Sequence, residues 1–174
     1  MINAFLIIGQ GVEDSEAIYP FYRLQEEGYS VHTLTHNDLP ITGKYGISFE
    51  PSCSVVDMMA SEISPDLIVI PGGHEGPDRV RQVPGIREIV KSGFLRGSII
   101  SSICHGPWVL VSAGIMNGLN ATSYKGCKDD IINAGAVWCD DEVVVDRNVV
   151  TAQHFRSNHL WMKATIDLVK ANSV

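Results

Sequence analysis

The chain has 174 residues, 45% hydrophobic and 19% charged, which is the composition of one globular domain with a full core. A net charge of −7 argues against a nucleic-acid backbone as a partner. We find no apolar run of membrane-spanning length, no secretion signal, and no CxxC or zinc-like spacing among the four cysteines. We therefore expect a cytoplasmic protein with reduced thiols, no disulfide, metal or cofactor, and neither nucleic acid nor membrane as a partner.

The first part of the chain alternates apolar runs with amphipathic stretches. These patterns predict a strand over 4–8, followed by a helix from Asp14 or Ser15 to the stop signal Gly28. A second strand is predicted over 30–35. After it come a turn-rich excursion over 40–50 that could form a hairpin, and a weak helix over 53–63. The helix owes its periodicity to Ile18, Phe21 and Tyr22.

The second part continues the alternation. It predicts a strand over 66–70, a short helix over 78–82 and a helix from Pro84. A strand over 98–103 comes next, and the helix after it ends at Gly114. The rest of the chain is predicted to form a short helix over 129–134, strands over 142–145 and 149–152 joined by a tight turn, and a last helix from about 158. The last helix is expected to bury Trp161, Ala164 and Leu168.

This alternation is typical of an α/β fold, a mostly parallel sheet with helices on both faces. Ligands bind such folds at the carboxyl ends of the strands. Three turns follow strands here: the one at Glu13, the one at Pro71-Gly72-Gly73, and the one at Cys104. We expect the three to share one crevice.

Cys104 stands at the tip of a buried strand and is followed at once by Gly106 and Pro107, which open a helix. A sulfur there faces the unpaired N–H groups of a helix N-terminus, which favour a thiolate. The geometry is that of a nucleophile elbow, G-x-S-x-G, with Cys for Ser and with Ser102 in place of the first glycine. From the residues alone, a buried structural cysteine is an equally good interpretation.

With Pro71-Gly72-Gly73 and Glu13-Asp14, the motif Cys104-His105-Gly106-Pro107 resembles the ThiJ/PfpI family of class I amidotransferase-like proteins, and among them the PfpI-type intracellular proteases. The similarity runs through the whole chain, including 42–46, 122–124, 128–135 and 142–146. The resemblance implies a single domain over 1–174 with a flavodoxin-like three-layer α/β sandwich. It also implies a reactive Cys104 and a homo-oligomer, either a dimer or a hexamer.

The resemblance suggests catalytic roles for four residues. Cys104 is the nucleophile, and Glu13 is expected beside it, where a protonated carboxyl holds the pKa of the thiol down. Glu13 is also well placed as a plain helix-N-terminal acid. His105 is the candidate general base, paired in PfpI-type proteins with a carboxylate of a neighbouring subunit; Asp78 matches that carboxylate, one methylene shorter and after an extra loop residue. Asp78 is equally suited to be a helix N-cap.

Other residues complete the predicted site. Gly72 or Gly73, with the backbone N–H of His105, is the candidate oxyanion hole, and Tyr124 and His154 are candidate pocket residues. The interpretation is an enzyme whose Cys104 adds to the carbonyl of a small molecule or peptide: a protease or amidase, or a glyoxalase III or protein deglycase. The alternative is a non-catalytic redox-sensing or chaperone-like stress protein in which Cys104 is oxidised.

Overall fold

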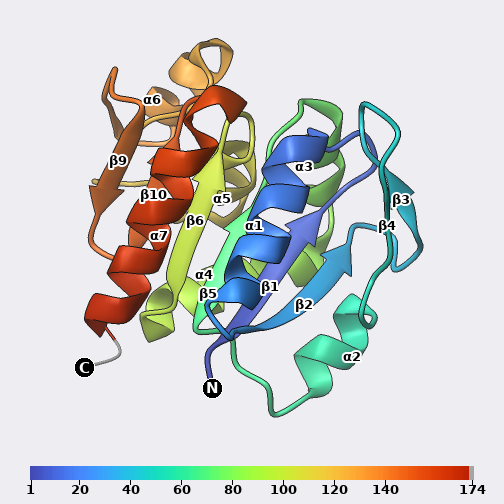
Figure 1. Ribbon diagram of the computed structural model, residues 1–174. Coiled ribbons are helices and arrows are strands. Elements are labelled where there is room, and N and C mark those ends of the chain that lie inside the picture. The colour runs from blue at the N-terminus through green and yellow to red at the C-terminus, as the bar shows by residue number, and fades with distance from the viewer. Residues whose placement is uncertain (173–174) are drawn as a thin grey trace.

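A computed structural model describes residues 1–172 and contains a central six-stranded sheet (Figure 1). In spatial order, the strands are β2 (Ser30–Thr35), β1 (Asn3–Ile8), β5 (Leu67–Ile70), β6 (Ile99–Ile103), β10 (Val149–Ala152) and β9 (Val143–Asp146). Neighbours pair in parallel except β9 and β10, which form an antiparallel hairpin at one edge. The apolar runs predicted all six strands. β5 and β6 are buried along their whole length because helices cover both of their faces.

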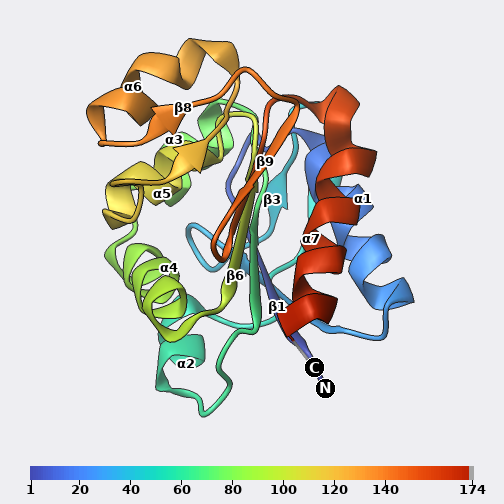
Figure 2. The ribbon, with the colours of Figure 1, turned by 90° about the vertical axis from the view of Figure 1, so that its left-hand side faces the viewer.

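Helices cover both faces of this sheet (Figure 2). On one face lie α1 (Asp14–Glu26) and α7 (Asn158–Asn172); on the other lie α2 (Val55–Ala60), α3 (Glu75–Val80), α4 (Pro84–Arg96), α5 (Pro107–Ala113) and α6 (Lys128–Asn133). Alternate side chains of β1 enter different cores, Phe5 and Ile7 on one face and Leu6 and Ile8 on the other. The predicted three-layer α/β sandwich is confirmed. Within residues 1–172, no helix is long and apolar enough to cross a membrane.

The buried face of α1 is only partly the one that its large apolar residues suggested. Phe21 packs against the core, as predicted. Tyr22 is 57% exposed, whereas Ala17, Pro20 and Leu24 pack inward. Their spacing of three to four residues defines one helix face, and Glu16 lies on the same face. A carboxyl group is thereby carried into the interior next to the sheet.

Small elements near the carboxyl ends of the strands were predicted less well. α3 begins at Glu75, whereas the predicted helix began three residues later at Asp78. The strands β7 (Asn120–Ala121) and β8 (Val137–Trp138) form a separate parallel pair that the sequence did not predict, because two-residue strands have no periodicity to detect. Short 3-10 helices occupy Lys125–Cys127 and Phe155–Ser157.

The predicted hairpin over 40–50 is present as β3 (Ile41–Thr42) and β4 (Ser48–Phe49). Asp14, in the first turn of α1, holds its turn: the two carboxylate oxygens accept the backbone N–H groups of Tyr45 and Ile47, each at 2.8 Å. The turn also pairs with the loop after β1, because the N–H of Lys44 donates to the carbonyl of Val12 at 2.8 Å. This hairpin is therefore fixed beside the carboxyl end of β1.

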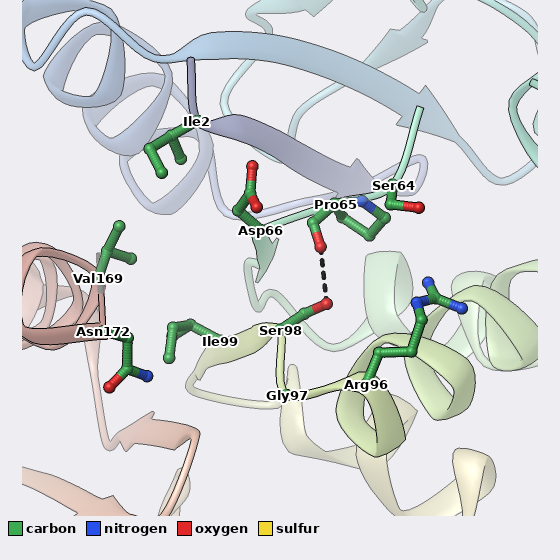
Figure 3. A pocket seen from close by; sticks show the side chains of 10 residues that line it. All are labelled: Ile2, Ser64, Pro65, Asp66, Arg96, Gly97, Ser98, Ile99, Val169 and Asn172. Atoms are coloured by element: carbon green, nitrogen blue, oxygen red, sulfur yellow. Dashed lines mark hydrogen bonds between the residues drawn. The ribbon is translucent and has the colours of Figure 1, made fainter. Parts of the chain in front are cut away.

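A cavity of about 270 Å³ lies at the opposite end of the sheet, around the amino ends of β5 and β6 (Figure 3). Its polar groups already serve the fold. The hydroxyl of Ser98 donates to the carbonyl of Pro65 at 2.6 Å, and Asp66 accepts the N–H of Asn3 at 2.8 Å. The residues that the sequence predicts for the site lie at the other end, where the strands reach their carboxyl termini.

Candidate active site

Cys104 occupies a strained turn between β6 and α5. Its φ of 61° lies in the left-handed region, where a residue with a side chain costs about 1–2 kcal/mol. Gly106 permits the tight turn, since a Cβ there would lie 2.5 Å from the carbonyl oxygen of Ile70. The Cys104 side chain is largely buried, with 7% of the residue exposed. These features match the geometry expected of a nucleophile elbow, a buried side chain in a tight turn between a strand and a helix.

His105 reaches the cysteine that precedes it. Its Nδ1 atom lies 3.2 Å from the Cys104 sulfur, because the unusual φ turns two neighbouring side chains toward each other. The imidazole stacks on the ring of Tyr124, with 4.6 Å between ring centroids, and meets Trp108 edge-on. Burial, then the charges of His74 and Lys44, lower the pKa of His105 to about 4. The ring is therefore neutral at pH 7 and can accept a proton.

The acid beside Cys104 is Glu16, which takes the place predicted for Glu13. The carboxyl of Glu16 lies close to Cys104, since a Cβ on Gly72 would be 2.5 Å from both, and its Oε2 accepts the N–H of Gly72 at 2.7 Å. Glu13 lies outside α1 in extended backbone, and its carboxylate is turned onto the helix start, where it accepts the N–H of Glu16 at 3.0 Å and the Ser15 hydroxyl at 2.5 Å. Glu13 thus acts as the helix N-cap, which was the simpler of its two sequence interpretations.

Burial governs the protonation of this pair. It raises the pKa of Glu16 to about 8, with a further contribution from the nearby Glu13 charge, so Glu16 is mostly protonated at pH 7. The pKa of Cys104 is also raised, first by burial and then by the Glu16 carboxylate. The expectation of a lowered thiol pKa is therefore corrected: the resting group is a thiol, because desolvation outweighs the N–H groups around the sulfur.

The backbone N–H groups of Gly73 and His105 favour the thiolate of Cys104 and so oppose the rise of its pKa. Of the two glycines proposed for the oxyanion hole, Gly73 is therefore the one whose N–H acts on the reacting atom, whereas the N–H of Gly72 is bound to Glu16. Gly72 instead provides space. A Cβ there would lie 2.5 Å from both the Cβ of Cys104 and the Oε2 of Glu16. A positive φ of 74° at Gly73 gives the loop its turn.

The three turns that the sequence predicted to meet lie in contact with one another. The N–H of Glu13 donates to the carbonyl of Gly72 at 3.2 Å, which joins the loop after β1 to the loop after β5. Gly72 in turn lies against Cys104 at the end of β6. Parallel strands place these three ends at one edge, as the topology requires.

Asp78 lies apart from His105 within this chain. It is exposed on α3, where its carboxylate accepts the Gln82 side-chain amide at 3.3 Å. It is not an N-cap either, because α3 begins at Glu75 and the cap position belongs to His74. Among residues 1–172, no carboxylate contacts the His105 ring.

Tyr124 and His154, the predicted pocket residues, line one cavity of about 310 Å³. Their rings are roughly parallel, with centroids 6.4 Å apart. Tyr124 also belongs to the elbow, since its N–H donates to the carbonyl of Cys104 at 2.9 Å. The cavity therefore adjoins the stacked pair of His105 and Tyr124.

Sequence reasoning missed Glu16 and Lys44. A signal for Glu16 existed: it is spaced with Ala17 and Pro20 on one side of α1, so a charged group shares an apolar face. Lys44 lies in the turn between β3 and β4, and its charge lowers the pKa values of both Glu16 and His105. The sequence has no periodic pattern that would indicate a contact between this hairpin turn and residues far away in the chain.

The comparisons with known proteins identify the family. The DJ-1/PfpI family matches residues 3–168, so the chain belongs to this family of α/β proteins. It is 43% identical over 161 residues to Deglycase PfpI of Pyrococcus furiosus, covering 91% of this chain and 93% of that one. It is 31% identical to the putative cysteine protease YraA of Bacillus subtilis, covering 95% and 96%.

Solved structures of similar proteins have the same fold as this chain. A two-domain protein of Anabaena variabilis, with DJ-1/ThiJ/PfpI-like and ferritin-like domains, superposes with a TM-score of 0.90 at 31% identity. The match covers 96% of this chain and 48% of the longer one, so the chain corresponds to about half of that protein. The Drosophila melanogaster protein DJ-1beta, 24% identical, has the same fold, with a TM-score of 0.88 and coverage of 97% and 90%.

Proposed function

We propose that this protein is a cysteine-dependent deglycase-type enzyme whose Cys104 adds to the carbonyl of a glyoxal or of an early glyoxal adduct. The observation that carries the proposal is the 3.2 Å approach of the neutral His105 Nδ1 to the Cys104 sulfur. A general base at hydrogen-bond distance activates a nucleophile that is protonated at rest. The name of the relative at 43% identity, Deglycase PfpI, supports the same class of reaction.

In the first step, the thiol proton passes to Nδ1 of His105 while the sulfur bonds to the aldehyde carbon of the substrate. The carbonyl oxygen gains the electron pair of its former π bond. The N–H groups of Gly73 and His105, which favour the thiolate of Cys104, are the candidates to stabilise this charge. Protonation of the oxygen by His105 gives a neutral hemithioacetal and restores the base.

In the second step, the C–H proton of the hemithioacetal carbon moves to the oxygen of the neighbouring ketone, which gives an enediol. The proton of the hemithioacetal hydroxyl is then lost, and a proton is added to the former ketone carbon. Glu16 is the candidate shuttle, because it lies close to Cys104 and its pKa of about 8 lets it give and take a proton near neutrality. The former aldehyde carbon is oxidised to a thioester and the ketone is reduced to an alcohol, so no external oxidant is consumed. Water then cleaves the thioester, releasing a 2-hydroxy acid and the free thiol.

Amide hydrolysis is the second candidate. The same sulfur, base and N–H groups suit attack on a peptide carbonyl, and the relative YraA is named a putative cysteine protease. This reaction makes an acyl-thioenzyme that water releases, and it does not use a proton shuttle at Glu16. Redox sensing is less well supported, because burial raises the pKa of Cys104 and leaves little of the thiolate that peroxide oxidises.

The deciding experiment compares wild type with Cys104→Ser on methylglyoxal, on its adduct with N-acetylcysteine, and on fluorogenic peptides. We expect 2-hydroxy acid release from the first two substrates by wild type only. Glu16→Gln then separates the two chemistries, since it should abolish the proton shift but spare peptide cleavage. Cys104-independent turnover, or no turnover with selective peroxide oxidation of Cys104, would overturn the proposal.

We further propose that the protein forms a homo-oligomer in which Asp78 of one copy approaches His105 of another. Two observations support this: Asp78 is exposed, and His105 meets no carboxylate within residues 1–172 of its own chain. Light scattering on the purified protein measures the assembly. Asp78→Asn should lower kcat without changing the mass, whereas a monomeric wild type with full activity would contradict the proposal.

A further inference from the structure

The cavity beside Tyr124 is next to the reaction centre but separate from it. Tyr124 belongs to both sites: its ring stacks on the His105 ring, and it also lines the cavity of about 310 Å³. The remaining walls come from the segments just before β9 and just after β10, and from the two 3-10 helices Lys125–Cys127 and Phe155–Ser157. A substrate whose carbonyl lies at Cys104 and which extends along the Tyr124 ring therefore reaches this cavity.

Charges of both signs line the cavity and do not neutralise each other. Arg156 and Glu142 both line it, yet they form no ion pair, and neither has an ion-pair partner elsewhere among residues 1–172. The third charged group, Lys125, already has a partner outside this set, the carboxylate of Asp140 at 3.7 Å. The guanidinium of Arg156 instead lies over the ring of Phe155, 6.0 Å from its centroid.

From this geometry we infer that the cavity is a subsite for a zwitterionic group, the α-amino acid end of a substrate. Arg156 binds the α-carboxylate and Glu142 binds the α-ammonium, so each unpaired charge meets its opposite in one ligand. A planar guanidinium suits a carboxylate because it donates two parallel hydrogen bonds. The inference rests on the proposed function and adds a substrate class to it: carbonyl adducts of free amino acids, or of peptides with both terminal charges close together.

The test measures binding separately from turnover. Four probes are titrated calorimetrically at low salt into Cys104→Ser, which keeps the fold but lacks the nucleophile: leucine, N-acetylleucine, leucinamide and N-acetylleucinamide. We expect leucine to bind most tightly, with about a two- to fivefold loss for each charge removed, because Arg156 and Glu142 are exposed and exposed ion pairs are weak. Arg156→Gln should abolish the advantage of a carboxylate, and Glu142→Gln that of an ammonium group.

Matched controls are Arg96→Gln and Glu88→Gln, two exposed residues on α4 away from this cavity, which should leave the ranking unchanged. Equal binding of the four probes, absence of binding, or a ranking unaffected by Arg156→Gln and Glu142→Gln would overturn the inference. The two proposals fail differently. If leucine binds preferentially but wild type shows no turnover, the subsite is supported and the deglycase proposal is contradicted. If wild type shows turnover but leucine is not preferred, the deglycase proposal is supported and the subsite is contradicted.

Discussion

The Oε2 atom of Glu16 accepts the backbone N–H of Gly72 at 2.7 Å, which ties the first turn of α1 to the loop that follows β5. The same carboxyl lies close to Cys104, because a Cβ on Gly72 would be 2.5 Å from both residues. Glu16 is thus a buried acid beside all three segments of the candidate active site. Its protonation matters for both stability and chemistry.

The first prediction concerns the pH dependence of stability. The pKa of Glu16 is about 8 in the folded protein and 4.5 as an isolated group, so between these values the folded state holds a proton that the unfolded chain has released. Its stabilising contribution is complete below pH 4.5 and is lost as the pH rises to 8, a change of about 4 kcal/mol.

Urea unfolding at pH 5, 6, 7 and 8 measures this contribution. Glu16→Gln keeps an acceptor for the Gly72 N–H but has no proton to release, so its free energy of unfolding should fall less steeply with pH than that of wild type. Glu88→Gln, at an exposed site, should follow wild type. Parallel curves for wild type and Glu16→Gln would show that the acid is ionised in the folded state.

The second prediction tests His105 as the base. His105→Asn retains a polar side chain of similar shape but cannot take the thiol proton, so turnover should fall by about 100- to 10,000-fold. Because the pKa of His105 is about 4, wild-type activity should not lose this base until the pH falls toward that value. The control His32→Asn changes a histidine on β2 and should retain activity. Full activity in His105→Asn would remove the base from the mechanism.

The third prediction concerns the space at Gly72. In Gly72→Ala the new methyl group would lie 2.5 Å from both Cys104 and Glu16. We therefore expect the free energy of unfolding to fall by about 1–3 kcal/mol and the activity to be lost. Gly97→Ala is the matched control, because Gly97 has a positive φ of 90° but open space around it. It should lose about 1 kcal/mol and keep its activity. Thermal unfolding and turnover of the two variants give the comparison.

The fourth prediction concerns the hairpin of β3 and β4. Asp14→Ala removes the acceptor of two backbone N–H groups and should destabilise the protein by about 1–3 kcal/mol. The amides of Tyr45 and Ile47 should then exchange with deuterium much faster. Asp129→Ala, an exposed change on α6, is the control. Unchanged exchange at the two amides would show that the hairpin is held by other contacts.

The fold was predictable because its signals are local and strong. A run such as 66–70 is apolar throughout, which indicates a strand covered on both faces, and Gly97 and Gly114 end their helices in left-handed conformations as helix stop signals do. The order of strands and helices then determined which ends meet. By contrast, the pair β7 and β8 is too short for any pattern to reveal.

The site was predictable in its position but not in its chemistry. Cys104 carried a local signature, whereas the choice between Glu13 and Glu16 depends on which face of α1 turns inward. Of Ile18, Phe21 and Tyr22, which the sequence placed on the inner face, Phe21 packs against the core but Tyr22 is exposed, and Ala17, Pro20 and Leu24 form the centre of the buried face. The direction of the thiol pKa depends on three-dimensional burial, which no short motif encodes.

Cys104 has a left-handed backbone, with a φ of 61°. Glycine is the one natural residue that adopts this angle without a penalty, and it has no sulfur. Replacing Cys104 with glycine would therefore relieve the backbone strain, but it would also remove a buried side chain and give the unfolded chain more conformational freedom. The strain at this dihedral angle is a consequence of placing a sulfur in a turn that suits glycine.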